Sequence, residues 1–238
     1  MKTIQMKGTV IPDDYSDVYD FWGLSSISPQ AVSEALDEAN GNDVTLEINS
    51  PGGYVTAGSE IYTMLKQYSG NVTANIVGQA ASAASWIALA ADKVMMSPTA
   101  TMFVHKAIGG GEGNSDDLTS IVQGLNETDK AFVDLYAKKS GKSPEDVYQL
   151  MQQSTTMNAK TAVQNGFADG IMFQNEATLA VNDAGALPIT ANVITKTKDI
   201  IHAKPKPKTD DVDKPIQENK DIDKGQVQKN LSLILWKD

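Results

Sequence analysis

One serine and one histidine of the sequence could work together as a nucleophile and a base. Ser82 lies in the small-residue stretch GQAASAAS, four residues after Gly78, where a predicted strand passes into a helix. His105 follows the apolar residues of a predicted strand, TMFV, whereas the other histidine, His202, lies in a charged C-terminal segment. A serine hydroxyl is almost un-ionised at neutral pH and needs a neighbouring base to attack a carbonyl. The pair therefore predicts acyl-transfer chemistry if the fold brings the two side chains together.

Each of these residues also has a plainer explanation. A serine at the start of a helix is commonly an N-cap, and a histidine after an apolar strand is commonly a hydrogen-bonded packing residue. The motif INSPGG ends a strand in Gly52 and Gly53, which could point main-chain N–H groups at a ligand or could form an ordinary tight turn. At a helix N-terminus the Ala83 N–H would lie beside Ser82 and could stabilise an oxyanion. The residues alone leave both explanations open.

The elements that must position these residues alternate between strand and helix signals, which predicts an α/β fold with right-handed crossovers. The pattern VTAGSEIYTMLKQYSG predicts a helix that ends at Gly70, and residues 115–140 carry apolar side chains at helical spacing. Caps are expected at Ser28, followed by Pro29, and at Ser143, followed by Pro144. Gly166 is expected to end a last short helix before a final strand.

The amino-acid composition argues against several kinds of binding site and partner. The absence of cysteine excludes disulfides, thiolate zinc sites and a cysteine nucleophile, and we expect neither a metal nor a cofactor. A net charge of -10 and the absence of arginine argue against a nucleic-acid partner. No apolar run approaches the roughly 18 residues of a membrane span, and no secretory leader is evident. We therefore expect a cytoplasmic protein.

The chain is expected to divide into a folded domain, residues 1–175, and a C-terminal tail, residues 176–238. Spaced prolines, blocky charges and few large apolar residues predict that most of the tail is a disordered linker. Apolar residues return at 231–236 in the sequence LSLILW. This short segment either docks on a partner or is a frayed chain end.

Four motifs, INSPGG, GQAASAAS, MFVHKA and TMNAKTAVQNGFADGI, resemble the ClpP family of serine peptidases in order and spacing. The set is most similar to the ClpP-like proteases encoded in phage head-assembly gene clusters, and the resemblance spans about residues 5–173. It implies a crotonase-like superhelix of stacked β-β-α units whose subunits assemble into rings. It also implies roles for particular residues: Ser82 as nucleophile, His105 as general base, and an oxyanion hole made by main-chain N–H groups of the Gly52–Gly53 turn and of Ala83.

The sequence departs from the family pattern at the third member of the catalytic triad. The resemblance places an acid three residues before Met157, where this chain has Ser154, and no Asp or Glu occurs between Asp146 and Asp169. The acid fixes the imidazole tautomer and stabilises its cation, and an amide in its place can cost about ten-thousandfold in rate.

Three outcomes remain open at this position. We favour a slow Ser-His dyad assisted by the hydroxyl of Ser154 or Thr155. Another acid, either Asp169 or the pair Asp116 and Asp117, could be recruited instead, or the protein could have lost catalysis. Gln153 stands where the family carries an arginine for contacts between stacked rings, which leaves a single ring or a different stacking open.

Two functions of different class follow. The first is an ATP-independent serine endopeptidase that cuts phage scaffold or capsid precursors in the cytoplasm of the bacterial host. The second is a catalytically weak or inactive ring-forming assembly protein on the same fold. An acyl-CoA enzyme of the crotonase type ranks third, because it would leave the Ser82 and His105 pair unexplained. An ATPase partner is not expected, since the chain starts almost directly at its first predicted strand.

Overall fold

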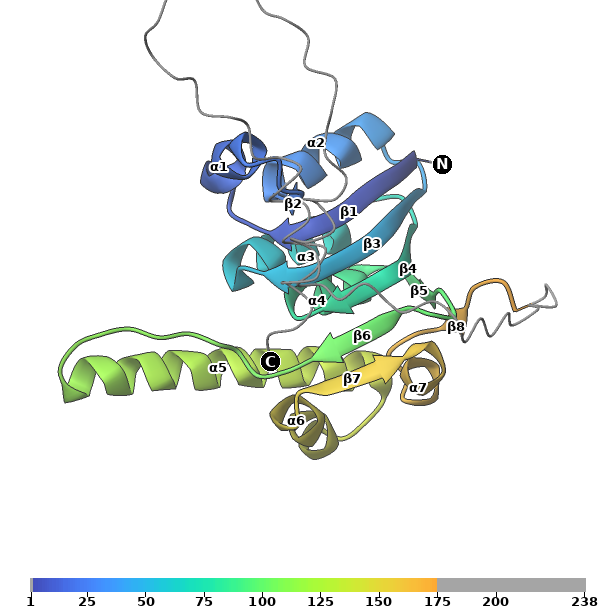
Figure 1. The fold of residues 1–238 in the computed structure, drawn as a ribbon. Coiled ribbons are helices and arrows are strands. Elements are labelled where there is room, and N and C mark those ends of the chain that lie inside the picture. The colour runs from blue at the N-terminus through green and yellow to red at the C-terminus, as the bar shows by residue number, and fades with distance from the viewer. Residues whose placement is uncertain (1, 175–238) are drawn as a thin grey trace, which may run out of the picture. The chain divides into compact units, whose positions relative to one another are not determined.

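The computed structural model describes residues 2–174, so the predicted tail at 176–238 and its apolar segment lie outside the described residues. Figure 1 shows a twisted sheet with helices packed against it. The sheet has eight strands in the order β2-β1-β3-β4-β5-β8, with β6 paired to β4 and to β7. All pairings are parallel except that of β6 with β7. The strands are β1 (Lys2–Val10), β2 (Ser26–Ile27), β3 (Val44–Gly53), β4 (Val72–Ala81), β5 (Lys93–Met96), β6 (Thr101–Val104), β7 (Thr155–Asn158) and β8 (Gly170–Ile171).

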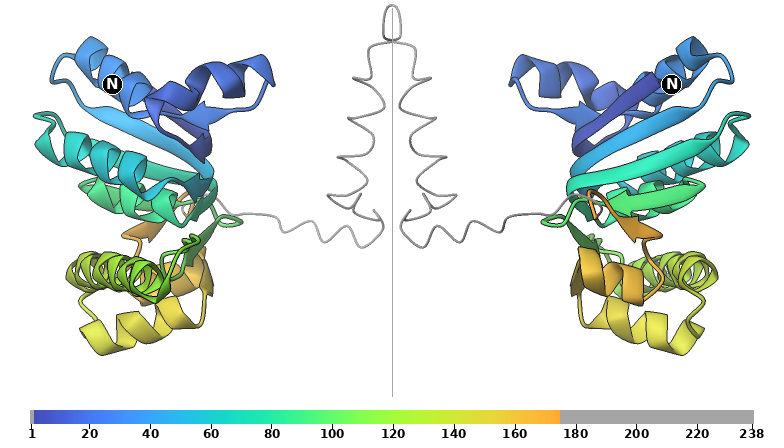
Figure 2. Two further views of the ribbon diagram at one scale, coloured as in Figure 1. Left: turned by 90° about the vertical axis from the view of Figure 1, so that its left-hand side faces the viewer. Right: turned by 90° about the vertical axis from the view of Figure 1, so that its right-hand side faces the viewer.

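Three helices cover one face of the parallel strands, as Figure 2 shows from two sides. They are α2 (Pro29–Ala39), α3 (Val55–Gln67) and α4 (Ala83–Ala90), and every residue of α4 is buried. Parallel strands bury both faces and therefore need such cover. The alanines of α4 let this helix pack directly against the central strands β3 and β4. The mixed α/β architecture predicted from the sequence is thus confirmed.

The other helices lie beyond this layer. They are α1 (Ser16–Phe21), which follows a short 3-10 helix (Asp13–Tyr15), α5 (Ser115–Ser140), α6 (Pro144–Gln152) and α7 (Ala159–Gln164). The long helix α5 reaches well past the edge of the sheet, with the glycine-rich loop 105–114 running beside it (Figure 1). Gly109 and Gly111 of this loop pack against Leu125 and Ile121 of the helix.

The sheet divides along β4. The first half of β4, from Thr73 to Ile76, pairs with β5, whereas the second half, from Gln79 to Ala81, pairs with β6. β6 then receives β7 on its other side in antiparallel register. The end of β4 therefore lies directly beside β6, the strand that leads into His105.

Most of the predicted helix ends are confirmed. Ser28 accepts a hydrogen bond from the Ala31 N–H with Pro29 in the first turn, and Ser143 caps α6 in the same manner. The prediction that Gly70 ends a helix was wrong, because α3 already ends at Gln67 and the next residue is extended. Gly70 serves a different purpose: a Cβ atom there would lie 2.7 Å from the carbonyl oxygens of both Gly41 and Asn42.

Candidate active site

Ser82 lies at the junction of β4 and α4 in a conformation that is rare for a residue with a side chain. Its backbone angles are φ 53° and ψ -125°, and its side chain forms no capping hydrogen bond with α4. The capping explanation for this serine therefore fails. Strained backbone angles of this kind persist where the surroundings impose them, and they are concentrated at functional sites. Here the Ser82 N–H donates to the Phe103 carbonyl of β6 at 3.0 Å, which fixes the junction against the neighbouring strand.

The structure brings Ser82 and His105 to one cavity. This cavity has a volume of about 290 Å³, and both side chains line it. The proximity follows from the sheet register: Ala81 is paired with Phe103, so the residues that follow on the two strands remain neighbours. The His105 ring stacks on the Phe103 ring with centroids 5.1 Å apart. No hydrogen bond within residues 2–174 joins the serine hydroxyl to the imidazole, and catalytic hydrogen bonds often tighten only when substrate binds.

Most of the remaining cavity wall is apolar or aromatic, and it comes from the Pro-Gly-Gly turn, α3, α4, α5 and the residues after His105. These lining residues are Pro51, Gly53, Val55, Trp86, Phe103, Lys106, Ala107, Ile108, Phe132 and Tyr136. Such a wall suits an apolar side chain of a substrate placed next to the serine. The segment that directly follows His105 thus forms part of the cavity wall.

The Pro-Gly-Gly turn approaches the serine so closely that only glycine fits. A Cβ atom on Gly52 would lie 2.7 Å from the Ser82 Cβ and 2.8 Å from the Ala83 nitrogen, and Gly52 has φ 85°. The Gly52 N–H already donates to Ser50 Oγ at 3.1 Å. Gly53, by contrast, lines the cavity itself. The turn therefore places one glycine against the serine segment and the next at the cavity.

Ser154 does not line the cavity. It is exposed, has φ 52°, and follows α6 immediately before β7. The last antiparallel pair joins Val104 to Thr155, so the register extended by one residue brings Ser154 level with His105. No hydrogen bond joins the two within the described residues, and Thr155 Oγ1 donates to the Leu150 carbonyl at 2.7 Å.

Two of the three acids considered as replacements for the triad carboxylate, Asp169 and Asp117, are engaged elsewhere. Asp169 accepts from the Val94 N–H at 2.6 Å and pairs with Lys139 at 2.9 Å. Asp117 accepts from the Asn114 N–H at the start of α5. The cavity that Ser82 and His105 share has neither of these acids, nor Asp116, in its lining. Within residues 2–174, no three His, Asp or Glu side chains are grouped to hold a metal ion.

Sequence reasoning missed a buried hydroxyl pair behind the nucleophile junction. Ser85 Oγ donates to the Ser82 carbonyl at 2.7 Å, and it lies 2.6 Å from the Tyr136 hydroxyl of α5. A serine hydroxyl has one proton, so Tyr136 must donate to Ser85. Burial raises the pKa of Tyr136 to about 12, which keeps its proton in place at neutral pH. The chain of two hydrogen bonds ties α5 to the carbonyl of the strained serine.

This direction of donation predicts unequal costs for removing the two hydroxyls. Ser85→Ala leaves the buried Tyr136 hydroxyl without a partner and is expected to lower the free energy of unfolding by about 1–3 kcal/mol. Tyr136→Phe leaves Ser85 its donor bond and should cost only about 1 kcal/mol. Urea denaturation of both variants and of the double variant measures these costs, and the double variant should lose less than the sum. A larger cost for Tyr136→Phe than for Ser85→Ala would contradict the assigned direction.

The parallel sheet, its covering helices and the added antiparallel pair of β6 and β7 are consistent with the ClpP fold. Residues 30–175 match the sequence profile of the Clp protease family, and the chain belongs to that family. It is 33% identical over 132 residues to the ATP-dependent Clp protease proteolytic subunit of Ligilactobacillus salivarius (strain UCC118), covering 55% of this chain and 67% of that protein. Proteins of this family form oligomeric rings and act on protein substrates. The predicted family resemblance is thereby confirmed.

No helix among residues 2–174 combines the length and the apolar character needed to cross a lipid bilayer.

Proposed function

We propose that this protein is a serine endopeptidase that cuts protein substrates through an acyl-enzyme. The observation that carries this proposal is the shared cavity: Ser82 and His105, 23 positions apart in the sequence, both line it. The strain at Ser82 supports a functional role for its hydroxyl, since that hydroxyl is spared from capping.

In the proposed mechanism, His105 takes the proton of Ser82 Oγ while the oxygen attacks the carbonyl carbon of the substrate. The carbonyl oxygen becomes an oxyanion, and main-chain N–H groups of Gly53 and Ala83 would stabilise it by about 3–4 kcal/mol each. His105 then donates its proton to the leaving amine, which leaves the acyl group on Ser82. Water, activated by the same imidazole, releases the acyl group and restores the serine.

The three main-chain groups predicted for the oxyanion hole differ in their surroundings. Gly53 lines the cavity, and the Ala83 N–H stands at the first position of α4, where the helix supplies no acceptor. The Gly52 N–H is engaged with Ser50. We therefore propose Gly53 and Ala83 as the donors, with Gly52 allowing the turn to approach Ser82.

For the third catalytic position we propose a dyad of Ser82 and His105 that Ser154 assists. The register of β6 and β7 supports this proposal, because it brings Ser154 level with His105. The Thr155 hydroxyl is less suited, since its proton is donated to Leu150 and its neighbour across the ladder is Val104. A hydroxyl can orient the imidazole but gives its cation little electrostatic stabilisation, so a slow enzyme is expected.

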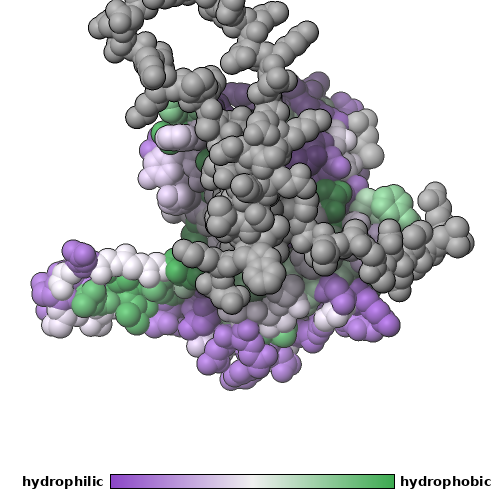
Figure 3. All heavy atoms as spheres, in the orientation of Figure 1, coloured by the Kyte–Doolittle hydropathy of each residue, from purple (hydrophilic) through white to green (hydrophobic). Residues whose placement is uncertain are grey.

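We also propose that identical subunits of this protein assemble into a ring. The proposed substrates are scaffold or capsid precursors of a phage, which the ring cuts in the cytoplasm of the bacterial host. The motif resemblance to phage-encoded ClpP-like proteases supports the choice of substrate. The apolar surface along the projecting end of α5 supports self-association. Figure 3 shows this surface, and the exposed large apolar side chains of α5 and of the loop before it are Leu118, Val122 and Ile108. Independence of ATP is part of the proposal, although the Ligilactobacillus relative is named as ATP-dependent.

Labelling with a fluorophosphonate probe tests the proposed chemistry. The full chain is treated with the probe, and the modified residue is located by mass spectrometry. We expect a single adduct on Ser82, together with a labelling rate at least about tenfold lower in His105→Ala, because the imidazole removes the proton. Absence of any adduct from the folded protein would instead favour the non-catalytic assembly role.

A further inference from the structure

A carboxylate is buried in the middle of α5. Asp129 is 3% exposed, and it is the only charged residue among the buried residues of the described part of the chain. Its neighbours along the same stripe of the helix are apolar, such as Leu125 and Val133. A buried carboxylate is costly unless partners compensate it, so the partners indicate what the charge does.

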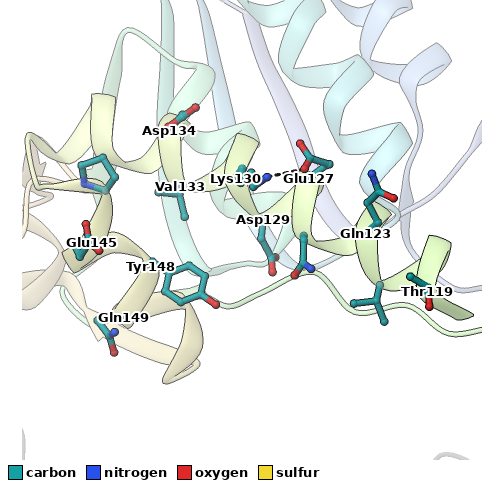
Figure 4. A pocket seen from close by; sticks show the side chains of 13 residues that line it. Thr119, Gln123, Glu127, Asp129, Lys130, Val133, Asp134, Glu145, Tyr148 and Gln149 are labelled. Atoms are coloured by element: carbon teal, nitrogen blue, oxygen red, sulfur yellow. Dashed lines mark hydrogen bonds and ion pairs between the residues drawn. The ribbon is translucent and has the colours of Figure 1, made fainter.

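Both partners of Asp129 belong to the two residues that directly follow His105. Asp129 Oδ1 accepts from the Ala107 N–H at 2.7 Å, and Asp129 Oδ2 lies 3.2 Å from Lys106 Nζ. Lys106 also donates to the Tyr148 hydroxyl at 3.2 Å and lies over its ring, 5.1 Å from the centroid. Hydrogen bonds to Tyr148 and Asp129 raise the pKa of Lys106. Figure 4 shows Asp129 on the side of α5 that faces Tyr148 of α6.

Few other contacts hold the side chain of His105 in place. Within residues 2–174 its ring forms no hydrogen bond, and it stacks on the Phe103 ring. The acid expected to hold the ring is replaced by Ser154. Beyond Ala107 the chain enters the glycine-rich loop, which has no regular secondary structure. The Asp129 bond is therefore the main-chain attachment nearest to the base on its C-terminal side, and the next main-chain hydrogen bond of this loop is that of the Asn114 N–H with Asp117.

We propose that Asp129 is a positioning residue for His105: it holds the main chain at Ala107 and thereby keeps the imidazole facing Ser82. This inference rests on the proposed role of His105 as the base. Asp129 takes no proton and touches no substrate in this scheme. Asp129 acts on His105 through its hydrogen bond to the Ala107 N–H, and the Lys106 ammonium group neutralises the charge of the Asp129 carboxylate.

Two substitutions separate the hydrogen bond from the charge. Asp129→Asn keeps an oxygen that can accept from the Ala107 N–H, and it should retain kcat within about tenfold. Asp129→Ala removes the acceptor, and a shift of the base by about 1 Å is expected to lower kcat and the fluorophosphonate labelling rate about 100-fold with KM nearly unchanged. Asp134→Ala, an exposed acid on the same helix, is the matched control and should leave both rates unchanged.

Amide exchange and NMR of the histidine ring give a readout that does not need activity. In the full chain, Asp129→Ala should accelerate exchange of the Ala107 amide and shift the His105 ring signals, which the variant His202→Gln assigns, since the chain has 2 histidines. Unchanged His105 signals and labelling rate in a folded Asp129→Ala protein would overturn the positioning role. An inert wild-type protein in which Asp129→Ala still moves the His105 signals would overturn the proposed peptidase function but not the anchorage.

Discussion

Ser82→Ala is expected to abolish cleavage of a fluorescein-labelled unfolded protein in the absence of nucleotide. The substitution removes the attacking oxygen, and removal of a serine nucleophile costs about 10³-fold or more even when the rest of the site remains. The fold should persist, because the Ser82 hydroxyl forms no hydrogen bond with α4 that the alanine would lose. Initial rates of fluorescence release measure the loss, and circular dichroism confirms that the variant is folded.

Ser59→Ala is the matched control for this loss. Ser59 is exposed on α3, so the same chemical change there should leave the rate unaltered. Residual cleavage by Ser82→Ala at more than about a tenth of the wild-type rate would assign the activity to another group or to a contaminant. In that case the acyl-enzyme scheme has to be abandoned.

Ser154→Asp is expected to raise kcat by about 10- to 1,000-fold, below the roughly 10⁴ that a carboxylate contributes in a complete triad. The position is level with His105 in the extended register of β6 and β7. Aspartate also tolerates the left-handed backbone found at residue 154, where φ is 52°. Single-turnover and steady-state rates on the same unfolded substrate measure the gain.

Gln153→Asp provides the control for added charge. It places the same carboxylate one residue earlier on an exposed site, so it should change the rate less than about twofold. A gain in Gln153→Asp equal to that in Ser154→Asp would show a general charge effect. A rate that Ser154→Asp leaves unchanged would mean that residue 154 does not reach the imidazole, and the proposed assistance by its hydroxyl would fail as well.

Local signals in the sequence were sufficient for many of the elements but not for their long-range partners. Ser28 and Ser143 are caps because a short side chain can reach the next turn of its own helix, which a sequence window reveals. Gly70 looked like a helix end for the same local reason, but glycine is required there because a Cβ atom would collide with the carbonyl oxygens of Gly41 and Asn42. The strand β7 was missed, because four residues between two helices carry too little pattern and depend on pairing with β6.

In the candidate site, too, single residues could be predicted from local sequence, whereas most of their long-range contacts could not. Ser82 and His105 could be paired from the sequence because each side chain carries chemistry of its own and the second histidine, His202, falls outside the predicted folded domain. Ser85 and Tyr136 could not be paired, since they are 51 positions apart and look like ordinary helix residues. The burial of Asp129 could have been predicted from the sequence. An acid within the apolar stripe of an amphipathic helix indicates a buried charge that needs a partner.

Asp129 and Tyr136 are seven positions apart on α5, which is about two helical turns, so they look in the same direction. Asp129 accepts a hydrogen bond from the Ala107 N–H, two residues after His105. Tyr136 donates to Ser85, which in turn donates to the Ser82 carbonyl. Inserting or deleting a single residue between them would rotate one away by about 100° and detach it. Over evolution this interval should therefore keep a constant length, whereas the part of the helix before it can lengthen or shorten without disturbing either attachment.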